Sequence, residues 1–408
     1  MVRSKDFLWN AIGTTLNSFL SMFYLIIITR VNGIELSGIF SFSFSIALLL
    51  QTLTNFGGRI YQVTDINEEF SLSEYLGIRA LMSVIGIIIS IIICRIYHSN
   101  LMGYLLTITL VLVKIIETFS DVIYGEFQKN ERIDLIGKSL VIKSTITIIA
   151  FLIVNLITKD LILSTFVILI FTFLFFLVFD IKKCNKKISL KMNYNLIKKT
   201  KNLFVTNFIL LIILNVPKFV GKIFLNEVDF GYLGIILMIP TVMLLFSQFI
   251  IVPILNKLTI YYNTNDINNS NKLIKQTILI LICITVVCIL AAIFLGKTVL
   301  GLLYGVNFDG YVIAFVLLIL SGMFNSFSSL FMNVLTILRK INVQVVVLVI
   351  VTIIVTILSI TLSKFFGIYG LISALLIAMI IENFIFYIVF ICHQKQLVNG
   401  KEISYGES

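Results

Sequence analysis

The sequence predicts an all-α polytopic membrane protein with about 12 transmembrane helices, arranged as two six-helix bundles around a central cavity. The 408 residues are 59% hydrophobic and only 12% charged, whereas soluble domains carry about 25% charged residues. The mean hydropathy is +1.08, and only three prolines interrupt the chain. This composition excludes an ordinary soluble enzyme, a disordered chain and a secreted disulfide scaffold.

Apolar runs long enough to cross a bilayer, about 20 residues each, recur along the whole chain. The first follows basic residues, as a signal peptide does, but its length and the spans after it predict an uncleaved helix. The expected spans are 7–30, 36–56, 76–97, 101–124, 137–157, 160–180, 203–225, 230–255, 273–295, 308–338, 343–363 and 366–391.

A lysine-rich stretch between the sixth and seventh spans divides the chain into halves. We therefore expect an N-terminal six-helix bundle at 1–180, a basic cytoplasmic linker at 181–202, a C-terminal six-helix bundle at 203–391 and a cytoplasmic tail at 392–408. The segment around Gly38, which opens span two, is echoed around Gly231, which opens span eight. Two parallel repeats, a common plan of transporters, predict such an echo.

The distribution of lysine and arginine predicts the orientation in the membrane. Of the 31 basic residues, 22 fall on the side that holds both termini and the 181–202 linker, and five fall on the other side. Cytoplasmic loops carry an excess of lysine and arginine. Both termini are therefore expected in the cytoplasm. The net charge of +11 follows from the same bias, so no nucleic-acid partner is needed to explain it.

No residue pattern predicts catalysis or a cofactor. The five cysteines form no CxxC pair, the two histidines are far apart in sequence, and no P-loop or paired-carboxylate arrangement is present. We expect a transporter that is not an enzyme and that holds no metal.

Charged residues inside spans cost about 2.5–3.5 kcal/mol each on insertion, so their positions indicate function. Span four carries Lys114, Glu117 and Asp121. The spacings of three and four place them on one arc of a helix, about 60° wide. Four other spans carry polar residues at similar spacing: Asn10, Thr14, Asn17 and Ser21; Ser139, Lys143 and Thr147; Asn215, Lys218 and Lys222; and Ser321, Asn325, Ser329 and Thr336.

Such stripes must face a neighbouring helix or water. Hydrogen bonds between helices and internal ion pairs, such as Lys114 with Glu117, would explain the serine, threonine and asparagine residues. The spans of Lys143 and Lys218 contain no acidic residue of their own, and Lys222 is close enough to a helix end to snorkel. The surplus positive charge favours a water-filled cavity that binds an anion. Glu382, in span twelve, is expected to pair or snorkel.

Several segments together resemble bacterial polysaccharide flippases of the Wzx type, in the multidrug/oligosaccharidyl-lipid/polysaccharide exporter (MOP) superfamily. Position 218 has lysine where the family's element usually has arginine, which keeps the charge but loses bidentate phosphate geometry. The similar segments are 7–13, 29–30, 38–40, 117–128, 132–134, 139–143, 215–218, 229–232, 303–305, 325 and 338–340.

The resemblance implies a flippase in the plasma (inner) membrane of a bacterium. It would move undecaprenyl-pyrophosphate-linked oligosaccharide repeat units across the membrane for capsule, O-antigen or exopolysaccharide assembly. The implied mechanism is alternating access, in which one half of the protein rocks against the other. A polysaccharide polymerase and other assembly proteins are possible partners besides membrane lipid.

These expectations assign roles to individual residues. Lys143 and Lys218 are expected to be the main phosphate-binding charges, supported by Lys114 and Lys222, with Arg30 at the outer mouth. Glu117 and Asp121 would serve ion coupling or charge balance, Asp121 by holding Lys143 or Lys114. The side chains expected to line the hydrated space and bind sugar include Asn10, Thr14, Asn17, Asn215, Asn325 and Ser329.

Three alternatives remain open. A cation-coupled multidrug (MATE-like) antiporter would favour a cavity dominated by acidic residues, whereas the spans here carry four lysines against Glu117, Asp121 and Glu382. Lipid II flippases usually have two further C-terminal spans, which are not expected here. A scaffold of a polysaccharide assembly complex that does not itself transport is the third alternative.

Overall fold

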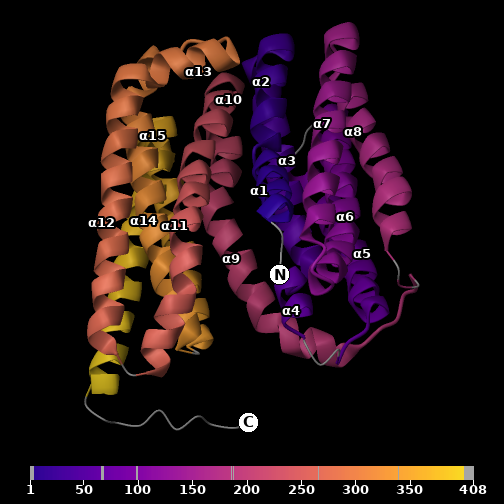
Figure 1. The fold of residues 1–408 in the computed structure, drawn as a ribbon. Helices are drawn as coiled ribbons and strands as arrows, with labels where there is room; N and C mark the ends of the chain where they lie inside the picture. Colours follow the sequence, from indigo (N-terminus) through magenta and orange to yellow (C-terminus); the bar gives the residue numbers. More distant parts are fainter. Residues whose placement is uncertain are drawn as a thin grey trace. The chain divides into compact units, whose positions relative to one another are not determined.

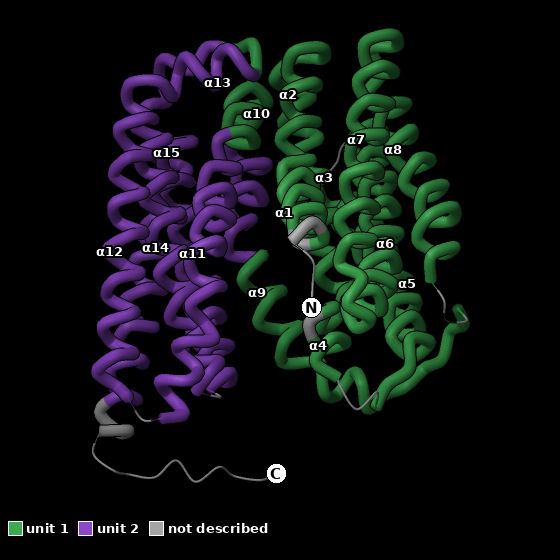
Figure 2. The backbone as a smooth tube through the Cα atoms, in the orientation of Figure 1, with its two compact units in different colours: residues 1–211, 226–235, 304–306 green, residues 212–225, 236–303, 307–408 purple. Residues whose placement is uncertain are grey.

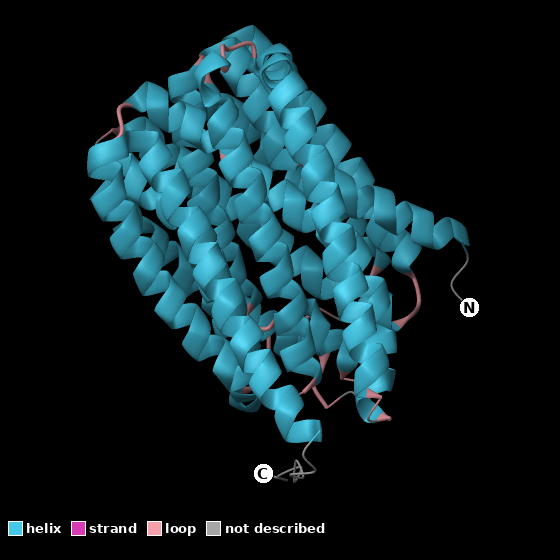
Figure 3. Cartoon of the chain, turned by 90° about the vertical axis from the view of Figure 1, so that its left-hand side faces the viewer, coloured by secondary structure: helices cyan, strands magenta, loops and turns pink. Residues whose placement is uncertain are grey.

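The chain is helical throughout the parts that the computed structural model describes, which are residues 4–65, 69–97, 100–184, 186, 188–264, 266–338 and 340–398. Figure 3 shows helices, loops and no strand among these residues. Helices dominate because backbone polar groups in lipid must be hydrogen-bonded within their own segment. The elements, labelled as in Figure 1, are α1 (Ser4–Ser18), α2 (Leu20–Asn32), α3 (Ile34–Asn55), α4 (Gly58–Thr64), α5 (Leu72–Tyr97), α6 (Leu101–Lys129), α7 (Ile133–Thr158), α8 (Leu161–Phe175), η1 (Phe176–Ile181), α9 (Tyr194–Phe224), α10 (Glu227–Ile236), α11 (Met238–Asn263), α12 (Ile267–Ala291), η2 (Ala292–Gly296), α13 (Lys297–Tyr304), η3 (Asp309–Tyr311), α14 (Val312–Ile337) and α15 (Ile341–Val398).

The number of membrane spans agrees with the prediction. Ten helical stretches are long and apolar enough to cross a membrane, and the bent pair formed by α1 and α2 makes eleven. One of the ten, Ile341–Gln394, is broken at Gly367, where φ is 54° and ψ is −127°. Counting its two halves separately brings the spans in the described residues to twelve. The protein is therefore a multi-pass membrane protein with the predicted all-α fold.

Helix ends differ from the predicted ends where the sequence is polar. Helix α9 begins at Tyr194, so the last part of the expected 181–202 linker is helical. Helix α15 continues past residue 391 to Val398, and the rest of the expected tail, 399–408, lies outside the described residues. Lysine, asparagine and glutamine extend a helix beyond the bilayer without adding hydropathy, because they are tolerated in exposed helical turns. The short helix α4 was not predicted either.

The chain divides into two compact units, coloured separately in Figure 2. Unit 1 comprises residues 1–211, 226–235 and 304–306, and unit 2 comprises residues 212–225, 236–303 and 307–408. Unit 1 thus contains α1–α8, η1 and the first part of α9. Unit 2 contains the end of α9 and helices α11, α12, α14 and α15.

Glycines allow helices of unit 1 to approach closely. A Cβ atom on Gly137 of α7 would lie 2.2 Å from the backbone carbon of Trp9 on α1, and a Cβ on Gly13 would lie 2.5 Å from the Gly137 carbonyl oxygen. The two segments that echo each other in sequence also meet, since a Cβ on Gly38 of α3 would lie 3.0 Å from Gly231 of α10. Small residues at helix crossings are the usual device of membrane helices, which gain little from hydrophobic association in lipid.

In unit 2, all three prolines of the chain lie on α9 and α11. Span eight is divided at Leu237, between α10 and α11, three residues before Pro240. Pro217 lies inside α9 and Pro253 inside α11. Proline removes one intrahelical hydrogen bond and clashes with the preceding turn, which bends a helix.

Candidate functional site

Helix α6 positions the first part of the candidate site in unit 1. The Lys114 ammonium lies 2.9 Å from the Glu117 carboxylate, one helical turn away. Gln51 on α3 donates a hydrogen bond to the same oxygen, at 3.3 Å. The Lys114 ammonium also lies over the ring of Phe44, 4.9 Å from its centroid. The ion pair considered from the sequence is thus present, and it neutralises one of the three acidic groups expected inside the spans.

Lys143 on α7 is the second part of the site, and it differs from Lys114 in its surroundings. Its side chain is only 4% exposed. The ammonium lies 6.0 Å from the centroid of the Tyr124 ring, and it forms no ion pair within 4 Å with a residue that the structure describes. A buried ammonium that is not ion-paired is costly in a membrane and marks a functional position.

A chain of hydroxyl groups lies beside Lys143. The Tyr124 and Ser139 hydroxyls are 2.7 Å apart, and Ser139 donates to a carboxylate oxygen of Asp180, also at 2.7 Å. Because the Ser139 hydroxyl has only one proton, Tyr124 donates to Ser139 and Ser139 donates to Asp180. The predicted stripe on α7 therefore points Ser139 at an acid and Lys143 at an aromatic ring.

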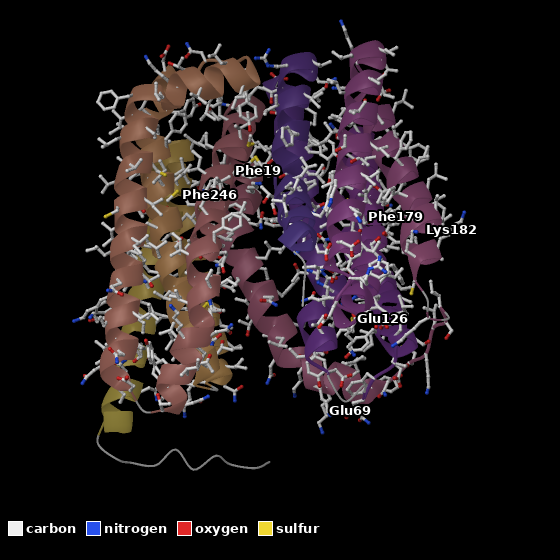
Figure 4. The ribbon with its side chains drawn as sticks, in the orientation of Figure 1. Phe19, Glu69, Glu126, Phe179, Lys182 and Phe246 are labelled. Atoms are coloured by element: carbon white, nitrogen blue, oxygen red, sulfur yellow. The ribbon has the colours of Figure 1, made fainter. Side chains whose placement is uncertain are left out.

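Asp180 is a site residue that the sequence treatment missed. It lies in the π-helix η1, next to Phe179 (labelled in Figure 4), and it is fully buried. Its second carboxylate oxygen has no hydrogen-bond partner among the described residues. Its signal in the sequence is an acidic residue at the last position of the expected span 160–180. A π-turn inserts an extra residue, which reorients the side chains that follow.

An internal cavity of unit 1 brings the predicted charges together. The cavity has a volume of about 10 Å³, and its polar lining comes from Lys114, Glu117, Lys143, Thr147 and Thr172. The remaining lining is apolar and includes Tyr24, Leu110 and Ile168. Two lysines and one carboxylate therefore line this small space, and Lys114 is in direct contact with Glu117. Positive charge exceeds negative charge among these lining groups.

Asp121 does not balance Lys143 or Lys114, and this prediction is wrong. Its carboxylate lies 3.6 Å from the guanidinium of Arg59 on α4. The helix α4, which was not predicted, returns the chain to α6 and delivers this partner. Nearby, Arg79 on α5 is buried, and it donates to the Thr54 carbonyl oxygen while two of its nitrogens have no partner among the described residues.

The other predicted residues of unit 1 lie apart from this cavity. Asn10 and Asn17 are half-buried on α1, and the Asn17 amide oxygen is buried without a hydrogen-bond donor in the described part of the chain. Arg30 is exposed at the end of α2, beside Gly305. Neither Arg30 nor the α1 asparagines line the cavity that holds Lys143.

In unit 2 the predicted residues lie on two helices. Asn215, Lys218 and Lys222 follow one another along α9, where Asn215 is buried and the two lysines are half-buried. Asn325 is buried on α14, and its amide nitrogen has no acceptor among the described residues. Ser329, one turn further on, accepts a hydrogen bond from Gln248 at 3.0 Å.

Glu382 on α15 neither snorkels nor forms an ion pair, so this expectation is wrong. The residue is 0% exposed, and it forms no ion pair within 4 Å with a described residue. A carboxylate charge there would be desolvated without compensation.

The arrangement supports binding and charge recognition. No group of three or more histidine, cysteine, aspartate or glutamate side chains that could hold a metal ion occurs in the part of the chain that was described. The chemistry available in unit 1 consists of two ammonium groups, one paired carboxylate and hydroxyl donors in a low-dielectric space.

Known proteins share sequence and fold with this chain. No protein-family model matches it. The chain is 26% identical to the capsular polysaccharide biosynthesis protein CapF of Staphylococcus aureus over 335 residues, which is 78% of this chain and 83% of that protein.

Two solved transporter structures align with nearly the whole chain. An inward-facing multidrug resistance MATE family transporter of the MOP superfamily aligns with a TM-score of 0.71 and 10% identity, over 96% of this chain and 100% of that chain. The lipid II flippase MurJ, in an inward closed conformation, aligns with a TM-score of 0.71 and 17% identity, over 96% of this chain and 91% of that chain. The fold is shared at these identities, as the resemblance predicted.

Proposed function

We propose that this protein is a flippase for lipid-linked oligosaccharides. The proposal is supported by its MOP-superfamily transporter fold and by its relative in capsular polysaccharide biosynthesis. Its substrate is an undecaprenyl-pyrophosphate-linked repeat unit, which it moves from the cytoplasmic to the outer leaflet of the bacterial plasma membrane. Both chain termini lie in the cytoplasm. The product supplies capsule, O-antigen or exopolysaccharide assembly.

The buried ammonium of Lys143 is the observation that carries the proposal. It shares a cavity with the Lys114–Glu117 pair, so positive charge exceeds negative charge among the groups that line it. A pyrophosphate attached to sugars does not cross hydrocarbon unaided, because its charge and hydroxyls would lose their water. Buried ammonium groups compensate the phosphate charge, and buried serine, threonine and asparagine side chains replace water around the sugar.

In unit 2, Lys218 and Lys222 on α9 add positive charge, and Asn215 and Asn325 add amide groups. We assign phosphate binding to Lys143 of unit 1 and to Lys218 of unit 2, and supporting roles to Lys114 and Lys222. Arg30 is assigned to the outer mouth of the substrate's route across the membrane. Lysine is a compact charge that does not grip phosphate in a bidentate manner, so each site holds the substrate loosely enough to release it.

A multidrug antiporter is the rival function, and the charges of unit 1 oppose it. A cationic drug needs acidic groups that are not already compensated. Glu117 is paired with Lys114, Asp121 with Arg59, and Asp180 accepts a hydrogen bond from Ser139. Transfer of a cation into the Lys143 cavity would bring like charges together.

The test is deletion of the gene in its source organism, followed by leaflet-resolved detection of lipid-linked intermediates. We expect intermediates to accumulate in the cytoplasmic leaflet and surface polysaccharide to be lost, with no change in sensitivity to cationic drugs. Complementation with the wild-type gene is the control. Increased drug sensitivity with normal intermediates would contradict the flippase and support the antiporter.

A further inference from the structure

A crevice in unit 1 opens between α7 and the α8–η1 segment. It has a volume of about 210 Å³ and is lined by Lys143, Ile146, Phe171, Leu174, Phe175 and Val178. Lys143 is the only polar residue among them. Helices α7 and α8 are neighbours in unit 1, as Figure 1 shows.

The outer side of this crevice faces the acyl chains of the membrane. Leu174 is 48% exposed and Val178 is 59% exposed. Both lie on a span of high hydropathy, Leu161–Ile181, of which only 28% is buried inside the protein. An exposed apolar surface on a membrane span is in contact with lipid.

The inner end of the crevice is the Lys143 side chain. The same residue also lines the enclosed cavity that contains Lys114 and Glu117. Lys143 therefore separates a lipid-facing apolar space from a polar interior. Its ammonium lies beside the Tyr124 ring and is not ion-paired within 4 Å with a described residue.

The local backbone shapes the apolar wall. The π-helix η1 turns Asp180 inward to Ser139 while Val178, two residues earlier, faces outward. The rings of Phe175 and Phe179 stack with centroids 5.0 Å apart, which stiffens this part of the wall. Asp180 is thereby kept out of the crevice, whose lining residues are all apolar except Lys143.

We propose that this crevice binds the phosphate-proximal isoprenyl units of a polyprenyl pyrophosphate, with the phosphate next to Lys143. The proposal rests on the proposed function, because it takes the lipid carrier from it. A polyprenyl pyrophosphate has no polar group between its single hydrocarbon chain and its phosphates, which matches walls without donors and a single cation at the end. A phospholipid would bring two ester groups and a second chain into the crevice, and its walls offer these esters no hydrogen-bond donor.

Binding of farnesyl pyrophosphate to the full chain in phosphatidylcholine nanodiscs tests the proposal. The informative variant is Leu174→Trp, which fills the crevice. The matched control is Leu163→Trp, on the same helix α8, which is 50% exposed and does not line the crevice. Because both positions face lipid, neither change disturbs the buried core. Empty nanodiscs correct for partition of the probe into lipid.

We expect Leu174→Trp to weaken binding about tenfold or more through steric exclusion, and Leu163→Trp to leave it unchanged. Lys143→Gln should weaken binding about a hundredfold, and Lys143→Arg should restore most of it. Farnesol and inorganic pyrophosphate should each compete poorly, since each supplies only half of the ligand. Equal binding by Leu174→Trp and the control overturns the proposal. Displacement of the probe by phosphatidylglycerol also overturns it and identifies a phospholipid as the occupant.

Failure of this inference is distinct from failure of the proposed function. The binding experiment does not depend on transport. Normal lipid-linked intermediates in a deletion strain would contradict the proposed flippase function, but they would not change the measured binding of the probe to the crevice. Conversely, a deletion strain that accumulates intermediates, together with unchanged binding by Leu174→Trp, retains the flippase and removes the crevice as the lipid site.

Discussion

Lys114 and Glu117 form an ion pair of 2.9 Å on one turn of α6, inside the membrane-spanning part of unit 1. Gln51 from α3 donates to the same carboxylate. The pair leaves Lys143 as the charge in their shared cavity that is not ion-paired with a described residue. Positive charge therefore exceeds negative charge among the groups that line this cavity of unit 1, which favours an anionic ligand.

The first prediction concerns this pair. Lys114→Gln alone should destabilise the protein by about 3–5 kcal/mol, because it leaves a buried carboxylate without its partner. The double variant Lys114→Gln, Glu117→Gln removes both charges and should recover most of the loss. The measurement is the thermal unfolding midpoint of purified protein in detergent. A double variant less stable than Lys114→Gln would show that the two side chains do not compensate each other.

The second prediction concerns the phosphate-binding lysines. Lys143→Gln and Lys218→Gln should each reduce transport about a hundredfold or more, since the phosphate loses a desolvated partner worth about 3–5 kcal/mol. Lys218→Arg keeps the charge and should be tolerated or should improve function. Surface polysaccharide in a complemented deletion strain is the measurement, with the exposed Lys201→Gln as the control. Normal polysaccharide from both properly inserted Gln variants would refute the assignment.

The third prediction concerns orientation. In a cysteine-free background, Leu190→Cys should be protected from an impermeant thiol reagent in intact cells, and Lys159→Cys should be labelled. The two exposed positions flank the same span, α8–η1. Burial raises the pKa of the native Cys184 thiol, which lowers its reactive thiolate fraction at neutral pH, so introduced cysteines are better probes. Labelling of the cysteine at position 190 without labelling of the cysteine at position 159 would show that the orientation in the membrane is opposite to the predicted one.

The fourth prediction concerns Glu382. Glu382→Gln should keep the expression level and unfolding midpoint of the wild type, because an uncharged amide suits a fully buried position that has no ion-pair partner among the described residues. Glu117→Gln is the contrasting variant, since that carboxylate is ion-paired and its loss should lower the midpoint. A large loss of stability from Glu382→Gln would mean that the carboxylate is charged and bound to a cation.

The fifth prediction concerns helix packing. Gly137→Ala should strongly destabilise unit 1, because its Cβ would lie 2.2 Å from the α1 backbone at Trp9. Gly86→Ala on α5 is the matched control, since its Cβ would have its nearest contact at 3.4 Å, with a Thr54 methyl group. At that position the better helix propensity of alanine, about 0.5–1 kcal/mol, should be neutral or stabilising. Equal thermal unfolding midpoints for the two variants would exclude a tight crossing of α1 and α7.

The sequence by itself determined the features that depend on neighbouring residues. Apolar runs define the membrane spans, because each helix satisfies its own backbone hydrogen bonds in lipid. Spacings of three and four placed Lys114 and Glu117 on one face of α6, and Ser139 and Lys143 on one face of α7, because helical geometry is local. The superfamily resemblance followed from short motifs distributed over most of the chain, and the shared fold agrees with it.

Only the tertiary structure decided which charges meet. Asp121 pairs with Arg59 because α4 returns the chain to α6. Asp180 reaches Ser139, 41 residues away, because a π-turn rotates it into the interior. Glu382 is fully buried and has no ion-pair partner among the described residues, although a lysine could have been supplied by another span. The reason is physical: the partner of a buried charge depends on how distant segments pack, and residue spacing within one helix carries no information about that.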